Sequence, residues 1–260
     1  MNLMYVRLLE QERELYRLPR NYDRFKAYLH MTLDIEKQRV RLPLLGMNPM
    51  AREHVAEFLD ALLAFDADGV GERAIQMAVS HVADVPGSFR VALVVCDDLR
   101  GGWTNRFSCE YAQRRCAPAP PGQAYLDWIP GVLGVSEPAT AETVRNDVLT
   151  AIYRVAHVHR HGAPQTLGSL MAQEGQVRAL AGCVNPALEA EDLEYTRSVI
   201  DPFLDATDMR TAIECLYGDA AVRILGFTPH GLSDRAGLAL ALHDARTVYF
   251  PPTVTESCER

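Results

Sequence analysis

The chain has 260 residues and 48% of them are hydrophobic, so it can bury a full core, and disorder over most of its length is excluded. Acidic side chains outnumber basic ones by 34 to 26, and the net charge of −8 argues against a nucleic-acid-binding surface. No apolar stretch approaches the roughly 20 residues that span a bilayer, and charged residues interrupt the N-terminal segment before it could act as a signal peptide. We therefore expect a cytoplasmic protein without a nucleic-acid or membrane partner.

The first 84 residues are expected to form four helices, because apolar side chains recur there at the spacing of one helix face. The expected helices cover residues 5–18, 22–40, 50–66 and 72–84. The first two carry large apolar side chains that could belong to the core or to a surface for self-association. These side chains are Tyr5, Leu8, Leu9, Leu15, Tyr16, Phe25, Tyr28, Leu29 and Met31.

The segment 89–111 contains the clearest strand signal. Residues 89–96 are an almost unbroken apolar run that follows Pro86-Gly87, which is typical of a strand covered on both faces. Residues 103–111 alternate between apolar and polar side chains, as in a half-buried strand. The two runs are joined by a six-residue loop that ends in Gly-Gly, so we predict a β-hairpin at 89–111.

The second half of the chain is expected to be helical again after residues 117–122, whose prolines predict a linker or surface loop. Residues 221–226 and 247–250 are expected to form a strand-helix-strand crossover around the last helix. The expected helices cover residues 141–161, 166–180, 189–205, 208–217 and 232–245.

Together these patterns predict an α+β fold that is predominantly helical and packed around a small mixed or antiparallel sheet. The hairpin at 89–111 forms the centre of that sheet. We expect one domain over residues 1–260, with a subdivision near 117–122 as the alternative.

The loop of the expected hairpin holds the strongest candidate site. Asp97 and Asp98 follow a buried strand, and two such carboxylates can hold a hard cation. Arg106 can clamp a carboxylate or phosphate with two parallel hydrogen bonds, and Glu110 completes the candidate catalytic set. The alternative is an ordinary exposed turn, in which Asp and Gly are favoured for turn geometry alone.

Histidines supply the second candidate. His157 and His161 lie four residues apart, so on a helix they share a face and could bind one metal ion. No general base lies between them, and histidines in the last turn of a helix are stabilised by its dipole without a ligand. We favour the second account. The His54 and Glu57 pair, like that of His81 and Asp84, is interpreted as a solvated helix face.

The leading functional hypothesis is a metal-assisted hydrolase or related enzyme acting on a small anionic substrate. Asp97 and Asp98, with or without His157 and His161, would hold a divalent metal that activates water, and Arg106 would orient the substrate. The alternative is a non-catalytic helical protein that forms a homo-oligomer or binds a partner through its N-terminal helices. Motifs of serine hydrolases, P-loop NTPases and Rossmann proteins are absent, and no residues assign the chain to a family.

Overall fold

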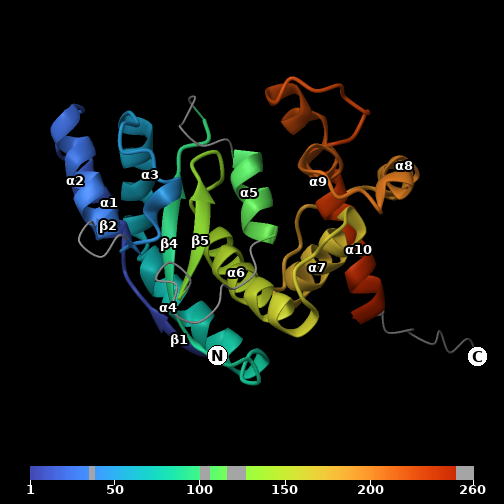
Figure 1. Ribbon diagram of the computed structural model, residues 1–260, viewed down its shortest axis with the longest axis horizontal. Helices are drawn as coiled ribbons and strands as arrows, with labels where there is room; N and C mark the ends of the chain where they lie inside the picture. The colour runs from blue at the N-terminus through green and yellow to red at the C-terminus, as the bar shows by residue number, and fades with distance from the viewer. Residues whose placement is uncertain (35–38, 100–105, 116–126, 250–260) are drawn as a thin grey trace, which may run out of the picture. The chain divides into compact units, whose positions relative to one another are not determined.

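The computed structural model describes residues 1–34, 39–99, 106–115 and 127–249 (Figure 1). The chain divides into two compact units, residues 1–163 and residues 164–260, which are treated separately below. Residues 117–122, where the sequence leaves a subdivision open, lie outside the described residues.

Unit 1 is built on a three-stranded parallel sheet with the strand order β1-β4-β5. The central strand β4 pairs with β5 along most of its length but with β1 only through its first four residues, so that Val91 lies opposite both Tyr5 and Ile129. The strands are β1 (Asn2–Tyr5), β4 (Ser88–Cys96) and β5 (Trp128–Gly134), and a separate antiparallel pair joins β2 (Leu33–Asp34) to β3 (Arg39–Val40).

The expected mixed or antiparallel sheet with a hairpin at 89–111 is therefore wrong, although the strand at 89–96 is confirmed. Residues 106–115 form helix α5 (Arg106–Arg115) instead of a second strand. Phe107 and Tyr111 fit a strand alternation, but they are also four residues apart and share one helix face. Trp103, which the alternation also used, lies outside the described residues, as does Asn105, the exception to it.

The sequence pattern does not predict the partner strand β5. This strand contains Pro130, Gly131 and Gly134, and proline and glycine are normally depleted in strands. Val135 N donates to Cys96 O at 3.1 Å, so by alternation the nitrogen of Pro130 faces away from β4. No hydrogen bond of the sheet is lost there, which is the condition under which an edge strand accepts proline.

Helices cover both faces of this sheet. All side chains of β4 from Val91 to Cys96 are at most 3% exposed, whichever face they point to. Figure 1 shows α1 and α3 on one side of the strands and α6 on the other. The helices of unit 1 are α1 (Leu9–Leu15), α2 (Tyr22–Thr32), α3 (Glu53–Ala64), α4 (Ala67–Ala78), α5 and α6 (Ala141–His161), with 3-10 turns η1 (Leu44–Gly46) and η2 (Val79–His81).

The four helices expected before residue 84 are confirmed in place, with different ends. The first begins at Leu9 because residues 2–5 form β1, and the second ends at Thr32. The fourth begins at Ala67, so Gly71 lies inside it. A Cβ atom at Gly71 would come within 2.4 Å of the Tyr5 ring, so glycine allows α4 to approach β1 closely.

The described part of unit 2 consists of helices, and its other three α-helices pack against the last one, α10 (Ala236–Tyr249). The expected strands at 221–226 and 247–250 are wrong, because residues 221–224 end α9 and residues 247–249 end α10. A short apolar run does not distinguish a buried helix from a buried strand. The elements are α7 (Leu167–Leu180), α8 (Ala190–Ile200), η3 (Asp201–Phe203), α9 (Met209–Ile224) and α10 (Ala236–Tyr249).

Within the described residues, no helix has the length and apolar content needed to cross a membrane.

Candidate functional site

Polar side chains gather at the carboxyl ends of β4 and β5. Asp97 and Asp98 directly follow β4, while Ser136 and Glu137 follow β5 after one further residue. Because the strands are parallel, both ends lie at the same edge of the sheet, which is where open parallel sheets commonly bind ligands. We therefore take this edge as the candidate functional site.

Asp97 is buried and hydrogen-bonded rather than part of an exposed turn. Its side chain is 2% exposed, its Oδ1 lies 2.9 Å from His54 Nε2, and its Oδ2 accepts from Asn48 Nδ2 at 3.0 Å. Burial acts to raise the pKa of Asp97, but the hydrogen bonds from His54 and Asn48 hold it below its usual value. Asp97 is accordingly an ionised carboxylate in a largely dry setting.

His54 lies in the first turn of α3, and its side chain is 12% exposed. An ionised carboxylate only accepts hydrogen bonds, so the contact with Asp97 assigns the ring proton to Nε2. The other ring nitrogen, Nδ1, is then an acceptor, and it is buried without a hydrogen-bond partner in the described part of the chain. The interpretation of His54 as part of a solvated face with Glu57 is wrong, because the ring points to Asp97.

Glu12 on α1 is a second buried carboxyl group beside the end of β4. Its side chain is fully buried, and Oε2 accepts from Val95 N at 3.1 Å. Val95 N has no acceptor on a neighbouring strand because β1 stops at Tyr5. The Glu12 carboxyl group therefore takes the place of a strand carbonyl as its acceptor. Burial raises the pKa of Glu12 well above its usual value, and its Oε1 has no partner among the described residues.

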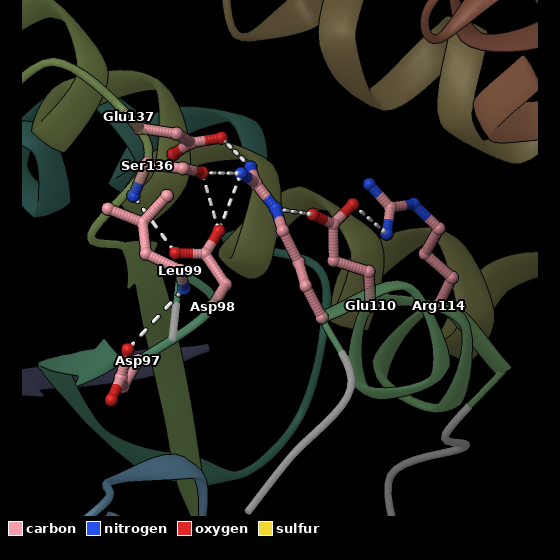
Figure 2. Close-up of polar contacts among 8 residues, drawn as sticks. Asp97, Asp98, Leu99, Glu110, Arg114, Ser136 and Glu137 are labelled. Carbon is pink, nitrogen blue, oxygen red and sulfur yellow. Dashed lines mark hydrogen bonds and ion pairs between the residues drawn. The ribbon is translucent and has the colours of Figure 1, made fainter. Parts of the chain in front are cut away.

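Asp98 belongs to a different set of contacts, which centre on Arg106. Figure 2 shows Asp98, Ser136, Glu137 and Glu110 gathered in this set. Arg106 Nη1 donates to Asp98 Oδ2 at 2.8 Å and to Ser136 Oγ, while Nη2 pairs with Glu137. Arg106 Nε donates to Glu110 Oε1 at 2.6 Å. Burial acts to lower the pKa of Arg106, but the surrounding carboxylates raise it above its usual value.

Close packing around Asp98 depends on Gly134, the last residue of β5. A Cβ atom at Gly134 would come within 2.6 Å of Asp98 Oδ2 and 3.2 Å of Arg106 Nη1. Asp98 Oδ1 also accepts from Ser136 N at 2.9 Å. The loop after β5 is therefore bound to the end of β4 through one buried carboxylate.

Arg106 is unsuited to the expected role of orienting an anionic substrate, because three carboxylates and a hydroxyl already engage its guanidinium. Glu110 is likewise engaged at both oxygens, since its Oε2 pairs with Arg114 at 3.0 Å. Figure 2 shows this chain of contacts running from Asp98 to Arg114, with Asp97 lying outside it. The structure thus joins Asp98, Arg106 and Glu110, and it joins Asp97 to His54 instead.

The expected metal ligands gain no support. His157 and His161 lie side by side on α6, with ring centroids 4.6 Å apart. Over the described ranges, no group of three or more His, Cys, Asp or Glu side chains is arranged to hold a metal ion. Gly162 ends α6, in agreement with the account in which the histidines lie at the end of a helix.

No protein-family model matches the sequence, and neither a curated protein nor a solved structure is significantly similar to it. The function has to be inferred from the geometry of the site.

Proposed function

We propose that the chain is an enzyme in which His54, held by Asp97, transfers a proton to or from a small polar substrate at the carboxyl edge of the unit 1 sheet. Hydrolysis is the reaction class that suits the pair best, because a neutral imidazole nitrogen can accept a proton from attacking water. The observation that carries the proposal is His54 Nδ1, a buried acceptor without a partner in the described part of the chain.

A buried acceptor that lacks a hydrogen bond costs about 1–3 kcal/mol, so such atoms in native proteins call for an explanation. A water molecule or a substrate hydroxyl that donates to His54 Nδ1 would remove this cost. Proton transfer to Nδ1 would create a cation, which the ionised Asp97 at 2.9 Å from Nε2 would stabilise.

The remaining candidate residues have positioning roles in this proposal. Asn48 binds the second oxygen of Asp97 and so fixes the carboxylate plane that orients His54. Asp98, Arg106 and Glu110 hold α5 and the loop after β5 beside the same edge. Fixed surroundings of this kind are required for a reacting group to keep a productive geometry.

The divalent metal and the anionic substrate of the sequence-based hypothesis have less support, because Asp98 and Arg106 bind each other. The alternative of a self-associating surface on the N-terminal helices also has less support. Most of the large apolar side chains proposed for it are buried within unit 1, namely Leu8, Leu9, Leu15, Tyr16 and Tyr28.

The proposal is tested by assaying the whole chain against chromogenic esters, amides, phosphoesters and glycosides, each with EDTA and with added Mg²⁺, Mn²⁺ or Zn²⁺. We expect turnover of at least one substrate class and a loss of about 10²- to 10⁴-fold in His54→Gln. Asp97→Asn should cause a smaller loss, because the ring remains but is no longer held. His159→Gln, an exposed histidine on α6, is the matched control.

Absence of turnover with every substrate, or turnover that His54→Gln leaves unchanged, would contradict the proposal. Activity that requires a metal and survives His54→Gln would instead favour the metal-assisted mechanism.

A further inference from the structure

A small pocket in unit 2 lies between α8, α10 and the segment 184–188. Its volume is about 190 Å³, slightly above the roughly 150 Å³ of a protein cavity that accommodates benzene. Most of the residues that line it are apolar, including Val184, Leu188, Leu193 and Leu242, while His243, Arg246 and Thr247 supply polar groups. Val184 is 49% exposed, so an apolar ligand here would also cover a side chain that water now surrounds.

A cation that has no ion pair among the described residues lies at this pocket. Arg246, on the last turns of α10, lines the pocket together with His243. Both residues are exposed. Other arginines of unit 2 are ion-paired, as Arg197 is with Asp244 and Arg210 with Glu214. Arg246 forms no ion pair with any described residue of unit 2. A guanidinium that has no ion pair within the described residues, beside leucine and valine side chains, is complementary to a ligand that joins an apolar group to an anion.

We propose that this pocket binds a small monocarboxylic acid with one aromatic or branched apolar group. The apolar group fills the space between Leu188, Leu193 and Leu242, and the carboxylate accepts two parallel hydrogen bonds from Arg246. The volume limits the apolar part to about the size of one benzene ring. This inference concerns unit 2 alone and is independent of the function proposed for unit 1.

The experiment titrates the whole chain with phenylacetate by isothermal calorimetry and compares it with phenylacetamide, which has the same shape without the charge. For a ligand of this size we expect a dissociation constant on the order of 0.1–1 mM. The amide should bind about tenfold more weakly, because it cannot form the charged pair with Arg246.

Variants separate the two parts of the pocket. Arg246→Gln should weaken phenylacetate about tenfold and remove its advantage over the amide. Ala187→Phe, at an exposed residue of the wall, should weaken both probes by occupying the apolar space. Arg73→Gln, an exposed arginine of unit 1, is the control and should leave binding unchanged.

The inference would be overturned by the absence of phenylacetate binding at about 10 mM. It would also be overturned if wild type and Arg246→Gln bound phenylacetate equally, since the charge would then have no role. Circular dichroism of each variant checks that unit 2 remains helical, so that lost binding reports on the pocket.

Discussion

Glu12 and Asp97 are both buried carboxyl groups beside the end of β4, yet their surroundings shift their pKa values in opposite directions. Burial dominates at Glu12, whose carboxyl group accepts a hydrogen bond from Val95 N, and raises its pKa. At Asp97 the effect of burial is outweighed by hydrogen bonds from His54 and Asn48, so its pKa falls below the usual value. Burial therefore favours the neutral form of Glu12, whereas hydrogen bonds favour the charged form of Asp97 at the same edge of the sheet.

Replacing Glu12 by Gln should stabilise unit 1 in a pH-dependent way. Because the pKa of Glu12 is raised on folding, the folded state retains a proton that the unfolded state has lost, and stability falls as pH rises between the two pKa values. Glu12→Gln keeps an acceptor for Val95 N and removes this loss. We expect a gain on the order of 1 kcal/mol at about pH 8 and little gain at about pH 5.

Thermal unfolding at both pH values measures this effect. Glu10→Gln, an exposed residue on the same helix, is the matched control and should show no such difference. An equal change in melting temperature at both pH values in Glu12→Gln would show that the carboxyl group is not buried in its neutral form.

At the scale of elements, α5 shows how one segment can satisfy two patterns. Its polar residues Arg106, Glu110 and Arg114 are each four apart and form ion pairs along one helix face. The same residues fall on one parity and so resemble the polar face of a strand.

Sequence periodicity located most helices of both units, because long amphipathic repeats give the strongest signal. It missed β1 and β5, which are short and, in β5, interrupted by proline and glycine.

Loss of the Arg106 guanidinium should release α5 from the edge of the sheet. Arg106→Gln would leave the buried carboxylate of Asp98 and the partly buried carboxylate of Glu110 without their shared partner, which we expect to cost about 3 kcal/mol. Hydrogen exchange should increase in α5 and in the loop after β5 before it increases in β4.

Arg7→Gln is the matched control, because Arg7 pairs with Asp66 and Glu72 at the surface with its side chain 53% exposed. Its loss should lower stability much less than the loss of Arg106, because solvent screens exposed ion pairs. Equal costs for the two substitutions would mean that the Arg106 contacts are as weak as surface pairs.

For the whole molecule, the candidate site combines segments that lie far apart in the sequence. His54 and Asp97 are separated by 43 residues, and Asp98 and Ser136 by 38. Asp97, Asp98, Arg106 and Glu110 could be selected from the sequence because they cluster after a strand. Their partners could not, because the pairings depend on the parallel order of the sheet, which periodicity does not reveal.

The division into two compact units predicts that residues 1–163 fold alone, because the sheet and the helices that cover it lie within this range. We expect this fragment to show helical circular dichroism and one cooperative unfolding transition. A fragment that is unfolded, or that unfolds without cooperativity, would show that its core needs residues beyond 163.

The proposed role of His54 requires that Asp97 holds the ring through Nε2 and leaves Nδ1 as an acceptor. Nitrogen NMR of the histidine rings, with His54→Gln used to assign the signal, reports which nitrogen carries the proton when the ring is neutral. We predict the Nε2-protonated form of His54 in the wild type and loss of this fixed form in Asp97→Asn. A proton on Nδ1 of His54 in the wild type would contradict the account.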